Sequence, residues 1–156
     1  YPSLVATLDA WIGGDELWHA DLNGSIDSLL QQNSVTAGGW YGAMKPHEGK
    51  PIVTYHKSWI YFAHRFGLEI AIEIEPKPGI PPGPGHTLNV INTIKGRKIP
   101  VLVVEPYYNR GAADSIAEKT GAAVLVLANA VGGCEGGCDD YIKLIDNAVK
   151  KLTSKL

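Results

Sequence analysis

Side chains that can bind a metal ion stand at the carboxyl ends of four expected strands of this 156-residue chain. His56 follows the first strand, Glu75 the second and Glu105 the third. Four more follow the fourth strand: Cys134, Cys138, Asp139 and Asp140. Imidazole nitrogens, carboxylate oxygens and thiolates are the donors that zinc and related cations take from proteins. Because neighbouring strands lie about 4.8 Å apart, one cation can draw on two or three strand ends.

The elements that position these residues alternate regularly from residue 51 onward. Apolar runs predict strands at residues 52–54, 68–75, 99–105 and 122–128, and helical spacing predicts helices at 59–66, 87–94, 112–119 and 139–152. Residues 76–85, rich in proline and glycine, are expected to form an extended loop. We therefore expect an α/β fold, a three-layer lobe with a four-stranded, mostly parallel sheet, preceded by an amphipathic helix. Ligands bind at the carboxyl edge of such sheets.

The chain changes character near residue 50. Residues 1–50 carry an amphipathic pattern of leucine, isoleucine and tryptophan without a convincing strand, so we assign them to a helical segment and residues 51–156 to the α/β lobe. A formal net charge of −2 provides no basic face, which excludes nucleic acid as a partner. The longest apolar runs are too short to span a bilayer.

Two of the candidate groups have a second interpretation. Glu75 and Glu105, each followed by proline, can instead accept backbone N–H bonds in the loops that they begin, as carboxylates at strand ends usually do. Cys134 and Cys138 suit a small disulfide-closed loop in an oxidising compartment or a pair of metal thiolates in a reducing one.

Several short motifs together resemble one protein family. They are Thr54-Tyr55-His56 with Trp59, Tyr61-Phe62 and Phe66-Gly67-Leu68, then Glu75-Pro76, Glu105-Pro106 and Asp140-Tyr141-Ile142. They resemble the carboxyl-terminal lobe of the periplasmic metal-binding proteins of zinc and manganese ABC importers, over about residues 15–156. The resemblance implies two α/β lobes joined by one long rigid helix, with a single metal ion in the cleft between them. Residues 1–50 then stand where the linking helix ends.

The resemblance also implies a ligand set. His56 matches the ligand from this lobe, and Asp139 or Asp140 matches the carboxylate before the last helix, with the register left open between them. A histidine at this position resembles the zinc members more than the manganese members, so we expect Zn²⁺, with Mn²⁺ as the alternative. The family's other two ligands are histidines of an amino-terminal lobe that is missing here. That lobe and the membrane permease of the ABC transporter are the expected partners.

The implied function is high-affinity capture of zinc for delivery to the importer, without enzymatic activity, in the periplasm or anchored at the cell surface. Thiols are oxidised in that compartment, so we expect a disulfide between Cys134 and Cys138 that stiffens the loop carrying Asp139 and Asp140. Two other classes remain: a small metal-dependent hydrolase with Glu75 or Glu105 as general base, and a metal-free interaction module. The sequence contains no HExxH, GxSxG or phosphate-loop motif that favours the hydrolase.

Overall fold

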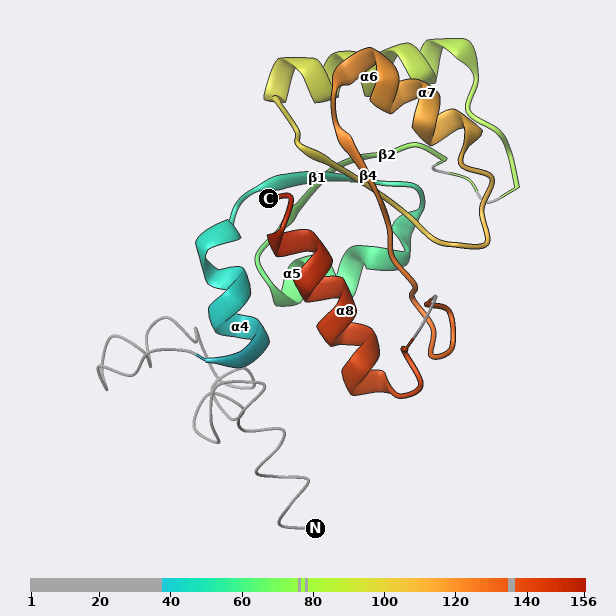
Figure 1. Cartoon of the computed structure of the whole chain (residues 1–156). Helices are drawn as coiled ribbons and strands as arrows, with labels where there is room; N and C mark the ends of the chain where they lie inside the picture. Colours follow the sequence, from blue (N-terminus) through green and yellow to red (C-terminus); the bar gives the residue numbers. More distant parts are fainter. Residues whose placement is uncertain (1–37, 76, 78, 135–136) are drawn as a thin grey trace, which may run out of the picture. The chain divides into compact units, whose positions relative to one another are not determined.

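The computed structural model of the chain describes residues 38–75, 77, 79–134 and 137–156 (Figure 1). The chain divides into two compact units, Tyr1–Pro46 and His47–Leu156. In the first unit the described residues form helix α4 (Gly39–Met44), and a 3-10 turn, η1 (Lys45–His47), follows it. The predicted helical pattern of residues 1–37 lies outside the described residues. No described helix is long and apolar enough to cross a membrane.

Four parallel strands form the sheet of the second unit. They are β1 (Pro51–Thr54), β2 (Glu69–Glu73), β3 (Val101–Val104) and β4 (Ala123–Val126). Their order across the sheet is β2-β1-β3-β4, and each neighbouring pair is parallel. The chain therefore runs from β1 to β2 on one side of it. It then crosses back over β1 to form β3 on the other side. The predicted α/β fold with a four-stranded sheet is confirmed, and the sheet is parallel throughout.

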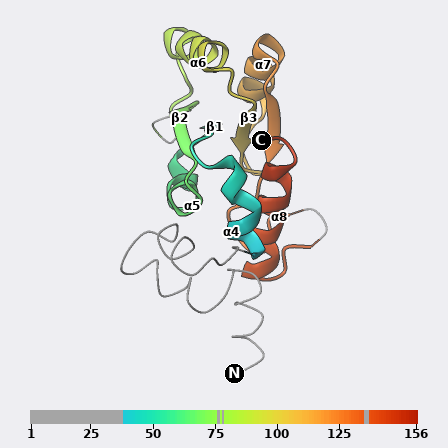
Figure 2. The same cartoon turned by 90° about the vertical axis from the view of Figure 1, so that its left-hand side faces the viewer.

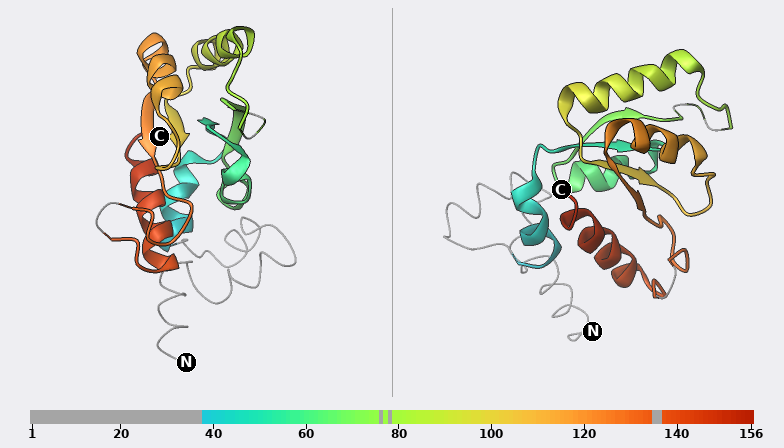
Figure 3. Two further views of the ribbon diagram at one scale, coloured as in Figure 1. Left: turned by 90° about the vertical axis from the view of Figure 1, so that its right-hand side faces the viewer. Right: turned by 45° about the horizontal axis from the view of Figure 1, so that its top comes forward.

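Helices cover both faces of this sheet. They are α5 (Ile60–Arg65), which continues the 3-10 turn η2 (Lys57–Trp59), α6 (Pro84–Arg97), α7 (Gly111–Thr120) and α8 (Tyr141–Thr153). Helices α6 and α7 lie side by side on one face, while α5 and α8 lie on the other (Figures 1 and 2). The two further views show the same three layers (Figure 3). The helices change face where the chain reverses direction, because strand–helix–strand crossovers are right-handed.

The core explains why β3 and β4 are apolar along their whole length. All four residues of β3 are buried, since helices cover the sheet on both sides. Towards α6 and α7, the apolar cluster includes Val53 and Leu102 of the sheet with Ile94 and Ile116 of the two helices. On α8 the buried side chains recur at helical spacing: Leu144, Ala148, Val149 and Leu152. This spacing gives α8 one apolar face.

Helix α6 is longer than its sequence predicted. The expected helix covered residues 87–94, whereas α6 runs from Pro84 to Arg97, and the preceding loop ends at Gly83. Proline is compatible with the first turn of a helix because the amide that it lacks would have no partner there. The prediction that residues 76–85 are all extended was therefore wrong for Pro84 and Gly85.

Candidate metal-binding site

His56 lies directly beyond the carboxyl end of β1, beside the point where the chain reverses direction across the sheet. Backbone pairing continues past the strand ends, since the Tyr55 N–H donates to Val103 O at 2.8 Å and the Glu75 N–H donates to Tyr55 O at 2.9 Å. Because β1 lies between β2 and β3, the residues that follow those strands flank His56. In parallel α/β sheets, ligands bind at such a reversal of strand order.

The His56 ring has one nitrogen engaged and one free. Nδ1 lies 2.7 Å from the backbone oxygen of Glu75, and a carbonyl oxygen can only accept, so Nδ1 carries the proton and donates. Nε2 is buried and has no hydrogen-bond partner among the described residues. In the neutral form of the ring with its proton on Nδ1, the lone pair lies on Nε2, and metal-ligating histidines are oriented in this way.

The Glu75 carboxylate faces the free nitrogen. Its Oε2 atom lies 3.7 Å from His56 Nε2, and the two side chains are only 9% and 5% exposed. Burial raises the pKa of Tyr55, and the nearby charge of Glu75 raises it further. Tyr55 is therefore a neutral phenol near the Glu75 carboxylate.

Glu105, at the end of β3, is fully buried, and neither of its carboxylate oxygens has a hydrogen-bond partner among the described residues. The interpretation that Glu105 accepts backbone N–H bonds in its loop is therefore wrong. The backbone oxygen of Glu105, not the carboxylate, closes that turn by accepting the Tyr108 N–H at 3.2 Å.

Two tyrosines that sequence reasoning did not assign to the site pack around His56. The Tyr108 ring meets His56 edge-on with centroids 4.4 Å apart and stacks on Tyr55 with centroids 5.1 Å apart. Burial raises the pKa of Tyr108, with smaller contributions from Tyr107, Glu105 and Glu75. The site thus combines the buried Glu75 carboxylate with aromatic rings, and a cation is the ligand that such surroundings favour. Only the turn after β3 brings Tyr108 here, so no sequence motif signals it.

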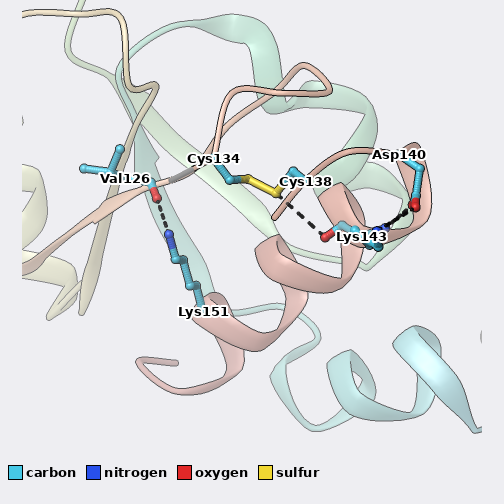
Figure 4. The surroundings of a disulfide bond; sticks show 6 residues. All are labelled: Val126, Cys134, Cys138, Asp140, Lys143 and Lys151. Carbon is cyan, nitrogen blue, oxygen red and sulfur yellow. Dashed lines mark hydrogen bonds and ion pairs between the residues drawn. A yellow bond between two sulfur atoms is a disulfide. The ribbon is translucent and has the colours of Figure 1, made fainter. Parts of the chain in front are cut away.

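Asp139 and Asp140 are exposed and lie immediately before α8. Figure 4 shows Asp140 beside Lys143. Asp140 is the N-cap of the helix, because its Oδ1 accepts the Lys143 N–H at 2.8 Å. Asp139 pairs with the Lys143 ammonium at 3.1 Å, and its side chain is 76% exposed. The predicted helix over residues 139–152 therefore begins two residues later, at Tyr141, since both aspartates precede it.

Replacing Asp140 with alanine is expected to lower the melting temperature at neutral pH, because the first turn of α8 loses its cap. The hydrogen bond from the Lys143 backbone lowers the pKa of Asp140 below its ordinary value. The contribution of the cap is therefore present above the unfolded-state pKa and is lost as the pH falls through the folded-state pKa. Thermal unfolding of both proteins at pH 7 and in strong acid measures this, and the difference should shrink in acid. Asp139→Ala, which removes no cap, is the control.

Cys134 and Cys138 form a disulfide with Cα atoms 5.4 Å apart, so the predicted bridge is confirmed and the pair of metal thiolates is not formed (Figure 4). Cys138 is buried and packs with Ala128 and Leu144. Its backbone oxygen accepts the Gly132 N–H at 2.7 Å. The bridge thus closes a small loop directly before the two aspartates, and the packing of Cys138 on Ala128 holds that loop near the end of the fourth strand.

Reducing this disulfide is expected to lower the free energy of unfolding by less than about 2 kcal/mol, because a short loop removes little entropy from the unfolded chain. Urea unfolding with and without reductant measures the difference. Alkylation of the unfolded, unreduced protein tests the bridge itself, and two labelled thiols would contradict it.

Of the predicted ligands, the structure places His56 beside Glu75 and leaves Asp139 and Asp140 engaged with Lys143. Among the described residues, no group of three or more histidine, cysteine, aspartate or glutamate side chains is close enough to hold a metal ion. Within the described part of the chain, His56 and Glu75 are a pair of such groups that lies close together.

Comparison with known proteins shows which family this chain resembles. Residues 39–155 match the model of the family described as zinc-uptake complex component A periplasmic. A high-affinity zinc uptake system protein, ZnuA, of Brucella abortus is 28% identical over 109 residues, which are 70% of this chain and 33% of that protein. The same figures apply to the protein of that name from Brucella suis. The chain thus spans about a third of the length of these curated relatives.

Solved structures share the fold. The laminin-binding protein Lbp of Streptococcus pyogenes superposes with a TM-score of 0.62 at 22% identity, covering 84% of this chain and 48% of that one. A mutant, manganese-bound periplasmic metal-binding protein of Candidatus Liberibacter asiaticus superposes with a TM-score of 0.63 at 19% identity, covering 74% and 44%. Since the family model covers most of the chain, the chain belongs to the family of periplasmic zinc-uptake component A proteins.

Proposed function

We propose that this chain captures a divalent transition metal, zinc first and manganese as the alternative, as cargo for an ABC importer. The observation that carries the proposal is the Nε2 atom of His56, which is buried, has no hydrogen-bond partner among the described residues, and lies beside a carboxylate while Nδ1 is held by a backbone oxygen. A neutral imidazole with its second nitrogen hydrogen-bonded to a carbonyl is well suited to bind zinc. The zinc uptake for which the Brucella relatives are named supports the same cargo.

The aspartates before α8 join this proposal as a second source of ligands. Asp140 uses one carboxylate oxygen to cap α8. If this side chain turned to a metal ion, the Lys143 N–H in the first turn of the helix would lose its hydrogen bond. Asp139 makes only an exposed ion pair with Lys143, and such pairs stabilise proteins little. Of the two, Asp139 is therefore the carboxylate that can turn towards a metal ion at the lower cost.

The partners and compartment follow from the same proposal. The family description is periplasmic, and we place this protein in the periplasm or at the cell surface, where the disulfide is stable. The remaining ligands would come from an amino-terminal lobe, and the metal would pass to the permease in the membrane. A binding protein of this kind catalyses no reaction, so the hydrolase is not proposed. A metal-free interaction module would not explain why the His56 ring is held with Nε2 buried and without a hydrogen-bond partner among the described residues.

Zinc titration of the purified protein by isothermal calorimetry tests the proposal. We expect saturable binding at one site and no turnover of ester or peptide substrates in the loaded state. Absence of zinc and manganese binding by the full natural chain would overturn the proposal.

A further inference from the structure

We propose that the Glu75 carboxylate is itself a metal ligand and shares the ion with His56, which rests on the metal-binding function proposed above. The family resemblance assigns His56 and an aspartate before the last helix and leaves Glu75 without a role. The pairing of β1 with β2 suggests the assignment, because it brings the two side chains together after the strands end.

The separation of the two donors fits a shared ion. Zinc lies about 2.0 to 2.2 Å from nitrogen and oxygen ligands, so two donors on one tetrahedral ion are about 3.4 Å apart. His56 Nε2 and Glu75 Oε2 are 3.7 Å apart. A direct hydrogen bond between them would need about 2.7 to 3.2 Å, and none is formed. The pair is therefore too far apart to bond directly and near the distance that a bound ion sets.

Glu75 is also held in place before metal arrives. Its backbone N–H donates to Tyr55 O at 2.9 Å, and its backbone oxygen accepts from His56 Nδ1 at 2.7 Å. One residue thus fixes the tautomer of the histidine and places a carboxylate opposite the free nitrogen. Because both groups are fixed, binding an ion here orders little that is not already ordered.

A carboxylate ligand also has a consequence for selectivity. Oxygen donors suit manganese, whereas imidazole suits zinc, so a mixed pair accommodates both ions. Removing the Glu75 carboxylate should therefore weaken manganese binding by a larger factor than zinc binding. This difference separates a ligand from a residue that only orients His56.

Glu75→Gln is the test, made in the full natural chain. The variant keeps the size of the side chain and an oxygen that can accept a hydrogen bond, but it removes the charge. We expect zinc affinity to fall at least about tenfold, manganese affinity to fall further, and the visible absorption band of bound Co²⁺ to shift. Zinc and manganese affinities are measured by competition with a chelator, and thermal unfolding confirms that the variant is folded. If it is not folded, Glu75→Asp, which shortens the side chain by one methylene, takes its place with the same readouts.

Glu105→Gln is the matched control. It removes another buried carboxylate, at the end of β3, and no group of three described donors places Glu105 with His56 and Glu75. We expect its Co²⁺ spectrum to match that of the wild type.

Two results would overturn the assignment and leave the proposed function standing. One is a Glu75→Gln protein with unchanged zinc affinity and Co²⁺ spectrum. The other is an equal loss of affinity in both variants with unchanged spectra, which would indicate a through-space effect of charge. Failure of the wild-type protein to bind any of the three ions would overturn the proposed function itself.

Discussion

Replacing His56 with alanine is expected to lower zinc affinity by more than about 100-fold, because residues that merely support a ligand already contribute 10- to 100-fold. The variant removes the free Nε2 atom that faces Glu75. Calorimetric titration of zinc into the wild-type and variant proteins measures the change. Equal affinity of the two proteins would remove His56 from the site.

Two further variants separate ligation from folding. His56→Asn keeps a side-chain N–H that can donate to the Glu75 carbonyl but has no counterpart of Nε2. We expect it to fold like the wild type and to lose zinc. His64→Ala is the matched control, because His64 is an exposed histidine on α5, eight residues after His56 in the chain. Its zinc affinity should equal that of the wild type, and a loss there would point to a site on the surface of α5.

Glu105→Met is expected to raise the free energy of unfolding by about 2 kcal/mol. The carboxylate is fully buried without a hydrogen-bond partner among the described residues, so folding removes it from water without replacing its hydrogen bonds. Methionine is unbranched and apolar, and it can adapt to the shape of the space that glutamate leaves. Urea unfolding should show a higher midpoint with an unchanged slope.

Glu118→Met is the control for this effect. Glu118 is an exposed glutamate on α7, and its replacement should change the free energy of unfolding by less than about 0.5 kcal/mol. A lower midpoint for Glu105→Met would show that the buried carboxylate has a stabilising partner in solution. In that case the strand end after β3 would be a second place to look for a bound cation.

The positions of the strands were predictable because each contains a short run of apolar residues. β3 is the clearest example, since its four residues are all apolar and all buried between two layers of helices. Helix boundaries were less predictable. Pro84 begins α6 although proline is a helix breaker elsewhere, and Asp140 precedes α8 because its side chain is used as the cap. Such ends depend on local hydrogen bonds that apolar periodicity does not record.

The sequence by itself determined the parallel α/β fold, the place of His56 after the first strand and the family motifs around it. These follow from local patterns, because apolar runs and strand–helix alternation are properties of neighbouring residues. Only the tertiary structure decided which carboxylate lies beside His56. Glu75 and His56 are 19 positions apart and meet because β1 and β2 pair in parallel, with a register shift between Ile52 and Val53, whereas Asp139 and Asp140 are occupied by Lys143. Register and side-chain contacts between distant segments depend on packing, so no spacing along the chain could have distinguished these carboxylates.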